Sequence, residues 1–303
     1  MKILVKVPAT SANLGPGFDS LGLALDLWNE TTITLAIEFS MRVKGEGGDS
    51  LSTDKNNLIF RAAERLAEFA GRSLPSFHVD CFNQIPLSSG LGSSAAATLT
   101  GLLAGNVLLG KPLLKEEILD LAAEMEGHSD NVSPALMGGL VVSTMDKGKV
   151  IAHKIAVAEN IPPLHITCVL PDYHLPTKEA RAVLPNQVAM QDAVHNISRA
   201  MLVTEAFRNG DLDLLGKSMS DTLHQPYRLK LIPGAQSAMG AAKEAGASAV
   251  ALSGAGPSVI AFSSKAEAGI GESMKRAFET AGLLNVRIFN LGVSGRGAEI
   301  QIQ

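Results

Sequence analysis

The stretch IPLSSGLGSSAAATLTGLLAG, residues 85–105, is the most informative part of this sequence and contains no charged residue. It opens with serine and glycine and continues as a run of small and apolar residues, typical of a buried helix. Gly90 and Gly92 let backbone N–H groups line a concavity without a Cβ in the way, and a helix start adds unpaired N–H groups and a partial positive charge. With Ser93 or Ser94 as the N-cap, the stretch predicts a phosphate-binding turn.

Two other interpretations of this turn stay open. It is not a Walker A loop, because no Gly-Lys-Ser/Thr follows the glycines. Gly90, Gly92 and Ala95 match the G-x-G-x-x-A pattern of dinucleotide-binding folds. That pattern requires an acidic residue about twenty positions further on, after a second strand, whereas Glu116 and Glu117 open a helix. The third interpretation is a tight structural loop before a well-capped core helix.

Length and composition indicate a globular chain of two domains. The chain has 303 residues, of which 46% are hydrophobic and 18% are charged, so it can bury a sizeable core. Its net charge is −4 and it has no basic run, which argues against a nucleic-acid surface. Cys81 and Cys168 lie far apart and suggest no disulfide framework, as expected for the cytoplasm. The uncharged segment 85–110 could span a bilayer, but serine, glycine, proline and Asn106 favour a buried helix, so no membrane is expected as a partner.

Strands and helices are interleaved along the whole chain. Residues 2–10 alternate apolar and polar side chains and predict a strand. Asp54 to Asn57 are capping candidates for an amphipathic helix that ends at Gly71. Prolines near residue 162 precede a new strand, so we place a domain boundary near Asn160 and expect domains of residues 1–160 and 161–303. The apolar face expected for that helix consists of Leu58, Ile59, Ala62, Ala63, Leu66 and Phe69.

Two further turns rich in glycine and serine each adjoin a predicted strand. They are SANLGPGFDSLG, residues 11–22, and LSGAGPSVIAF, residues 252–262, which includes Gly254 and Gly256. The plain interpretation of the second is a hairpin loop. Three turns rich in glycine and serine, each beside a strand, are more than hairpin loops alone usually require.

Five ordered motifs resemble those of the homoserine kinases, which share a superfamily with galactokinase, mevalonate kinase and phosphomevalonate kinase. The motifs are PATSANLGPGFDSLGLAL (8–25), IPLSSGLGSSAAA (85–97), EGHSDNVSPALMGGLV (126–141), HQPYRLKLIPG (224–234) and LSGAGPSVI (252–260). The resemblance implies an α+β fold with an N-terminal domain like domain 2 of ribosomal protein S5 and a ferredoxin-like C-terminal domain. It also implies phosphorylation of the side-chain hydroxyl of L-homoserine by ATP and Mg²⁺, in threonine biosynthesis.

The resemblance also implies where the nucleotide and the metal bind. Asn57 would lie by the base, and Glu126 would bind Mg²⁺ together with the hydroxyl of Ser93 or Ser94. Taken alone, Glu126 is a solvated side chain in the last turn of a helix, where the macrodipole disfavours a carboxylate by roughly 0.3–1 kcal/mol. The residues expected around the phosphates are Pro86, Leu87, Ser88, Ser89, Gly90, Leu91, Gly92, Ser93, Ser94, Ala95 and Ala96, with Gly254 and Gly256.

For the amino-acid substrate, the resemblance implies a second group of residues. Asp19 would pair with the α-ammonium, Arg181 and Arg228 would clamp the carboxylate, and Asn131 would hydrogen-bond the hydroxyl. Taken alone, Thr177 is a plain N-cap, Arg181 a surface charge and His128 a structural residue, although the spacing of Thr177 and Arg181 would place both on one helix face. The expected substrate-binding residues are Asn13, Asp19, His128, Asn131, Thr177, Arg181 and Arg228.

Two mechanisms for the hydroxyl stay open: Asp130 acts as the general base, or Asn131 positions the hydroxyl without a base. The compact EGHSDN segment departs from the longer, distant relatives. The rival functions are a kinase for a mevalonate-type acid, a nicotinamide-dependent oxidoreductase and a non-catalytic amino-acid-binding regulator. The expected partners are small molecules, not nucleic acid or a membrane, and both a monomer and a homodimer stay open.

Overall fold

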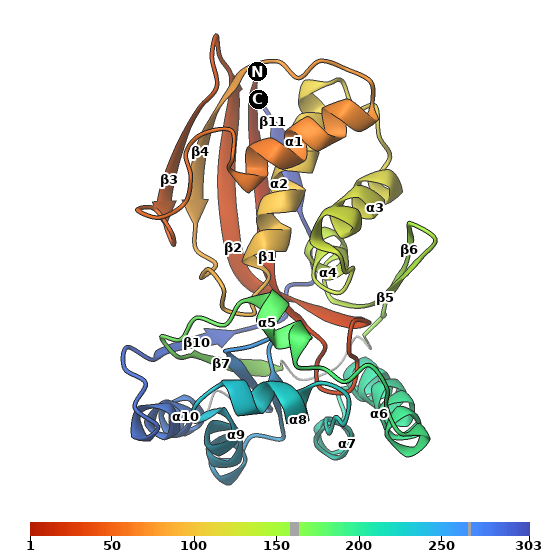
Figure 1. Cartoon of the computed structure of the whole chain (residues 1–303), viewed down its shortest axis with the longest axis vertical. Helices are drawn as coiled ribbons and strands as arrows, with labels where there is room; N and C mark the ends of the chain where they lie inside the picture. The colour runs from red at the N-terminus through yellow and green to blue at the C-terminus, as the bar shows by residue number, and fades with distance from the viewer. Residues whose placement is uncertain (158–163, 266–267) are drawn as a thin grey trace.

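The computed structural model describes residues 1–157, 164–265 and 268–303, which form two bodies stacked along the long axis (Figure 1). One body is built on a seven-stranded sheet and the other on a four-stranded sheet. Both chain ends lie together at the far end of the first body. Helices and strands are mixed in each body, which confirms the expected α+β class.

The larger sheet has the strand order β11-β1-β2-β4-β3, with β5 paired to β2 and β6 paired to β5. Ile3, Val5 and Val7 of β1 are buried, as the alternating pattern predicts. Beyond Pro8 every residue of β1 is buried, because this end of the strand runs between the two bodies. The strands are β1 (Lys2–Ala12), β2 (Leu21–Leu35), β3 (Ser40–Gly45), β4 (Phe77–Asn83), β5 (Leu140–Asp146), β6 (Lys149–Lys154) and β11 (Glu299–Ile302).

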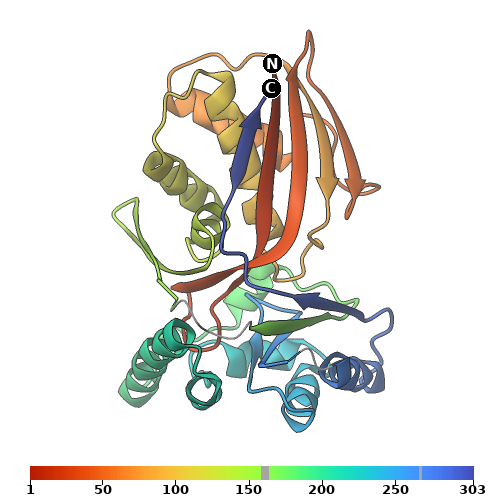
Figure 2. The ribbon, with the colours of Figure 1, turned by 180° about the vertical axis from the view of Figure 1, so that it is seen from behind.

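Four helices cover one face of this sheet, and Figure 2 shows the opposite face with β11 beside β1. The first of them begins as predicted, since the Asn57 side chain accepts a hydrogen bond from the Ile59 N–H and Gly71 has a left-handed φ of +61°. Phe69, expected in the core, is 52% exposed, because the buried face includes Phe60 and Ala67 instead. The helices are α1 (Leu58–Phe69), α2 (Ser93–Leu108), α3 (Lys115–Glu126) and α4 (Val132–Met137).

Helix α2 lies in the core of the first body, so the uncharged segment 85–110 is a buried helix preceded by a turn. Its N-cap is Gly92 with a φ of +73°, not Ser93 or Ser94, and no side chain caps it. The left-handed cap suits glycine, and both serine hydroxyls are therefore free for other partners. Among the helices that the structure describes, none combines the length and the hydropathy that a membrane span requires.

The smaller sheet has the order β10-β7-β9-β8, and its neighbouring strands are antiparallel. This is the ferredoxin-like βαββαβ order that the family resemblance implies. The strands are β7 (His165–Leu170), β8 (Ala249–Leu252), β9 (Val259–Ser263) and β10 (Arg287–Leu291). The helices are α5 (Thr177–Ala182), α6 (Met190–Asn209), α7 (Leu212–Ser218), α8 (Gln225–Arg228), α9 (Ala235–Glu244) and α10 (Ala268–Thr280), with a 3₁₀ turn at Leu229–Leu231.

The two bodies meet where the three glycine turns come together. Ser253 Oγ lies 2.7 Å from the Gly90 carbonyl oxygen, and the Gly254 N–H donates to the Ala12 carbonyl at 3.1 Å. Any Cβ on Gly90 would overlap the Ser253 carbonyl oxygen, so only glycine fits there. The predicted boundary at Asn160 lies outside the described residues, and the division into residues 1–160 and 161–303 stays a prediction, with β11 contributed to the first body by the end of the chain.

Candidate active site

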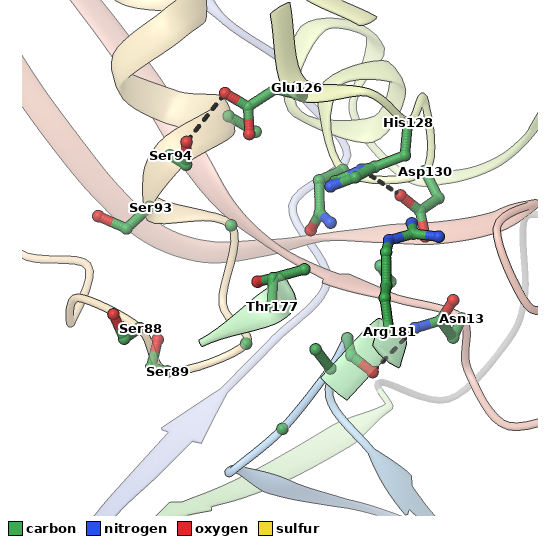
Figure 3. A pocket seen from close by; sticks show the side chains of 18 of the residues that line it. Asn13, Ser88, Ser89, Ser93, Ser94, Glu126, His128, Asp130, Thr177 and Arg181 are labelled. Carbon is green, nitrogen blue, oxygen red and sulfur yellow. Dashed lines mark hydrogen bonds and ion pairs between the residues drawn. The ribbon is translucent and has the colours of Figure 1, made fainter. Parts of the chain in front are cut away.

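A cavity at this junction is lined by residues of both bodies (Figure 3). It brings together every predicted substrate residue, both candidate catalytic groups and most of the predicted phosphate residues. The lining residues are Ala12, Asn13, Asp19, Ser88, Ser89, Gly90, Gly92, Ser93, Ser94, Ala95, Glu126, His128, Asp130, Asn131, Leu175, Thr177, Arg181, Arg228, Gly254, Ala255 and Gly256.

A second cavity adjoins the first and shares Ser88, Ser93 and Ser94 with it. Asn57 and Leu87 line this second cavity, together with residues of β2, β3, β4, α1 and α2. The Asn57 amide is held at both ends, since its Nδ2 donates to the Ser52 carbonyl at 2.7 Å and its Oδ1 accepts from Ile59. Of the predicted phosphate residues, Pro86, Leu91 and Ala96 line neither cavity and are buried.

The turn between the two cavities has the geometry of an anion cradle. Gly90 and Gly92 both adopt left-handed φ angles, +81° and +73°. The turn is anchored to β1, because the Thr10 N–H donates to the Leu91 carbonyl at 3.0 Å. The start of α2 borders the cavity, since Gly92, Ser93, Ser94 and Ala95 line it, and no side chain caps this helix end, which contributes a partial positive charge.

Glu126 is the last residue of α3, and two hydroxyls hold its carboxylate. Its Oε1 accepts hydrogen bonds from Ser94 Oγ at 2.9 Å and Thr98 Oγ1 at 2.6 Å. Among the described residues none donates to Oε2, which leaves that oxygen available at the cavity. Ser93 Oγ is instead 3.4 Å from the Ile85 carbonyl, so Ser94 rather than Ser93 is the serine beside Glu126. Thr98 escaped the sequence analysis, although it lies one helical turn after Ser94.

His128 and Asp130 face each other across the tight turn that follows α3. Gly127 ends the helix with a φ of +78°, which lets the chain reverse within the compact EGHSDN segment. His128 Nδ1 lies 2.7 Å from Asp130 Oδ1, and Asp130 is buried. Burial by itself lowers the pKa of His128, but the carboxylates of Asp130 and Glu126 outweigh it and raise the pKa above its ordinary value. The two carboxylates therefore favour the imidazolium form of His128 more than water does for a free histidine.

Asn131 has a fixed amide orientation. Its Oδ1 accepts a hydrogen bond from Thr10 Oγ1 at 2.8 Å, and Thr10 is fully buried on β1. Because Oδ1 is engaged, Nδ2 is the group that this amide can offer to a ligand in the cavity. Thr10 lies 121 residues away in sequence, and no local pattern pointed to it.

Asp19 and Arg181, which the family resemblance assigns to opposite charges of the substrate, pair with each other in this structure. Arg181 Nη1 and Nη2 donate to the two carboxylate oxygens of Asp19 at 2.9 and 2.8 Å. Asn13 links the Asp19–Arg181 pair to the glycine turn at residues 252–262. Its Oδ1 accepts a hydrogen bond from the Asp19 N–H, and its Nδ2 donates to the Gly254 carbonyl. Helix α5 begins at Thr177 as expected, but Pro176 is the N-cap, so Thr177 is not a plain cap.

Arg228 ends α8 and is almost completely buried, at 2% exposure. Its Nε donates to the Ala180 carbonyl at 3.1 Å, and Nη1 lies 3.2 Å from His224 Nδ1. Burial and the nearby charge of Arg181 lower the pKa of Arg228 to about 10, so it stays cationic near neutral pH. Phe18 packs its ring against this guanidinium, 5.1 Å from the ring centroid. Phe18 and His224 were missed as site residues, although both lie in the motifs quoted above.

Comparison with known proteins identifies the family. Residues 57–139 match the GHMP kinases N-terminal domain and residues 203–280 match the GHMP kinases C-terminal domain. Homoserine kinase of Moorella thermoacetica is 45% identical over 281 residues, covering 92% of this chain and 94% of that protein. This chain belongs to the homoserine kinase family. A second family member, from Deinococcus radiodurans, is 46% identical over 260 residues, 85% of this chain and 83% of that one.

Solved structures agree with this assignment. The homoserine kinase of Cytophaga hutchinsonii has a TM-score of 0.86 and 33% identity, covering 99% of this chain and 97% of its own. The mevalonate kinase of L. major, at 17% identity and a TM-score of 0.68, shares the fold alone. The dinucleotide-binding interpretation of the glycine turn is therefore wrong: Gly90 and Gly92 belong to a GHMP kinase fold.

Proposed function

We propose that this protein transfers the γ-phosphoryl group of ATP to the side-chain hydroxyl of L-homoserine, as a step of threonine biosynthesis. The observation that carries the proposal is the pair of adjoining cavities. The cradle of Gly90 and Gly92 lies where they meet, and charged groups suited to an α-amino acid lie in the first. The relatives named homoserine kinase support the substrate over a mevalonate-type acid, which would need no partner for an ammonium group.

The nucleotide would occupy both cavities. Its base would lie in the second cavity near Asn57, and its phosphates would lie along the turn toward Gly254. The turn offers backbone N–H groups and the positive end of α2. These groups, rather than lysine side chains, would bind the phosphates.

Homoserine would bind by replacing the ion pair between Asp19 and Arg181 with two ion pairs to its own charged groups. Its ammonium would take Asp19 and its carboxylate would take Arg181 and Arg228. A zwitterion replaces both halves of the Asp19–Arg181 pair, so no charge in this half-buried site is left without a partner. A simple alcohol would have to leave the pair intact, and it would gain nothing from Arg228.

Glu126 fits a magnesium site. Its Oε2 oxygen is available at the cavity, and Ser94 fixes the other oxygen. The described residues contain no cluster of three or more histidine, cysteine or acidic side chains that could hold a metal, which suits Mg²⁺ because it keeps several waters and relies on substrate phosphates. When bound, Mg²⁺ would neutralise charge on the transferred phosphoryl group.

In the transfer, the homoserine hydroxyl oxygen forms a bond to the γ-phosphorus, the bond from phosphorus to the bridging oxygen breaks, and the hydroxyl proton is released. Asn131 Nδ2 would donate to the hydroxyl oxygen and direct its lone pair toward phosphorus. The amide cannot take the proton. Asp130 is the candidate acceptor, although its Oδ1 faces His128 Nδ1 at 2.7 Å. Positioning by Asn131 is therefore the larger expected contribution.

An ADP-release assay across homoserine, serine, threonine and mevalonate tests the proposed function. We expect homoserine to give the highest kcat/KM, because its hydroxyl lies one carbon further from the charged pair than that of serine. Turnover of mevalonate at a similar rate would contradict the assignment of Asp19 and Arg228 to an amino acid.

A Glu126→Gln variant should need a higher Mg²⁺ concentration for half-maximal rate, by about tenfold, because an amide is a poor ligand for a hard cation. Glu124→Gln is the matched control, since Glu124 lies on the same helix but pairs with Arg65 on the surface. Titration of the rate with Mg²⁺ at saturating ATP measures the difference. The same midpoint for both variants would remove Glu126 from the metal site.

An Asn131→Ala variant should lower kcat by roughly three- to tenfold, the effect of one lost hydrogen bond. ATP affinity, measured by calorimetry, should stay near that of the wild type, since the amide lies outside the second cavity, where the base would bind. A weaker ATP affinity with an unchanged kcat would contradict the role in orienting the hydroxyl.

An Asp130→Asn variant separates a base from a positioning group. If positioning is sufficient, we expect the pH–rate profile to keep its shape and kcat to fall by less than about tenfold. Loss of the acidic limb of the profile would assign Asp130 as the base instead.

We also propose a cytoplasmic location, which agrees with two free and buried cysteines, Cys81 and Cys168. A homodimer stays a proposal beside a monomer, and sedimentation velocity measures which form is present.

A further inference from the structure

His224 connects two parts of the substrate site without lining the cavity. It precedes α8, is fully buried, and lies between the segment 13–19 and the Arg228 side chain. Its Nε2 is 2.8 Å from the Gly15 carbonyl oxygen, and its Nδ1 is 3.2 Å from Arg228 Nη1. One imidazole ring therefore touches both the loop that carries Asn13 and Asp19 and the guanidinium of Arg228.

The partners of the two ring nitrogens determine the tautomer. The Gly15 carbonyl oxygen only accepts, and so does Asp221 Oδ2 at 3.5 Å, so Nε2 carries the hydrogen. Arg228 only donates, so Nδ1 must present a lone pair. Burial and the charge of Arg228 lower the pKa of His224 against the opposing effect of Asp221, which agrees with a neutral ring.

The direction of the Arg228 guanidinium depends on few contacts. Ala180 accepts from Nε, His224 accepts from Nη1, and the Gly254 carbonyl is more distant from Nη1 at 3.4 Å. Among the described residues none accepts from Nη2, so Nη2 remains for a ligand in the cavity. Loss of the His224 acceptor would leave Nη1 with its long contact only.

Phe18, in the segment 13–19, packs against both His224 and Arg228. Its ring stacks on the His224 imidazole with centroids 5.2 Å apart and planes 23° apart. The same ring lies near the guanidinium groups of Arg228 and Arg181, at 5.1 and 5.8 Å from its centroid. Because Phe18 precedes Asp19, the stack ties the orientation of both arginines to the position of Asp19.

We propose that His224 is a positioning residue for homoserine binding: as the Nε2–H tautomer it holds Nη1 of Arg228 and the Gly15 carbonyl, and so sets the distance between the carboxylate clamp and Asp19. The inference rests on the proposed function for the role of Arg228. His224 itself does not touch the substrate. Its effect should therefore appear in the KM for homoserine and leave the transfer step little changed.

Two substitutions of His224 test separately its contact with Arg228 and its contact with Gly15. His224→Asn keeps an acceptor at the place of Nδ1 and loses the contact with Gly15, whereas His224→Gln keeps a donor at the place of Nε2 and loses the acceptor for Arg228. Both variants lose the stack on Phe18, so that loss cancels in the comparison. We expect His224→Gln to raise the KM for homoserine by about tenfold or more relative to His224→Asn, with kcat and the KM for ATP alike in both.

Equal KM values for homoserine in the two variants, or a matching rise in the KM for ATP, would overturn the inference in favour of a purely structural histidine. A measurement on the unchanged protein covers the case in which the variants do not fold. Long-range ¹H–¹⁵N correlation spectra of the wild type should show His224 as the neutral Nε2–H tautomer, and the Nδ1–H tautomer would overturn the inference. Failure of the proposed function looks different: the wild type would then release no ADP in response to homoserine.

Discussion

A Gly92→Ala variant is expected to lose about a hundredfold in kcat/KM for ATP, the scale of effect that a misplacement of about 1 Å in a reacting group can have. A Cβ at this position would overlap Thr10 Oγ1 and lie 3.2 Å from Asn131 Oδ1. Thr10 is fully buried on β1 and cannot move away without breaking its hydrogen bond to Asn131. The substitution should therefore disturb both the proposed phosphate turn and the Asn131 amide that we propose orients the hydroxyl.

Gly71→Ala is the matched control for this variant. Gly71 also has a left-handed φ, +61°, but nothing lies within 4 Å of the Cβ that alanine would add. Both variants should lose about 1 kcal/mol of unfolding free energy from backbone strain, measured by denaturant titration, and Gly92→Ala should lose more because its Cβ overlaps Thr10. Only Gly92→Ala should lose ATP affinity and rate, measured by calorimetry and by ADP release. Similar kinetics for the two variants would show that the contact with Thr10 does not matter to the site.

An Arg228→Lys variant is expected to raise the KM for homoserine by at least about tenfold, or about 1.4 kcal/mol. Lysine keeps the positive charge but loses the planar fork, so it cannot bond to Ala180 and to the carboxylate of the substrate in the same geometry. Arg228 is almost completely buried, so its guanidinium has little access to water. A lost charge-assisted hydrogen bond is costly in such a place.

The alternative for Arg228 is a structural arginine that holds α8 to the carbonyl oxygens around it. In that case the lysine variant would lose thermal stability and raise the KM values for homoserine and ATP alike. If Arg228 binds the substrate, the KM for ATP should barely move, because Arg228 does not line the second cavity and meets the expected phosphate residues only at the Gly254 carbonyl, 3.4 Å from its Nη1. The ratio of the two KM values decides between these roles.

Interactions between close neighbours in sequence could be predicted well. Asn57 caps α1, Gly71 ends it, and Gly90 and Gly92 lie in the turn before α2, all as expected. The preferences behind these features act over a few residues: a side-chain cap reaches the next turn, and glycine adopts positive φ wherever the chain needs it. The family motifs added the two-domain fold and the list of residues that meet in the cavity.

The sequence and its family motifs thus predicted the element types, the glycine turn before α2 and most of the residues that meet in the cavity. The tertiary structure alone decided how those residues pair. It placed Ser94 rather than Ser93 beside Glu126, joined Asp19 to Arg181 across 162 residues, and joined His224 to Gly15 across 209. These contacts cross the junction between two bodies or between two helices. Their partners depend on strand register and on how the bodies pack, and no local preference of a side chain specifies either.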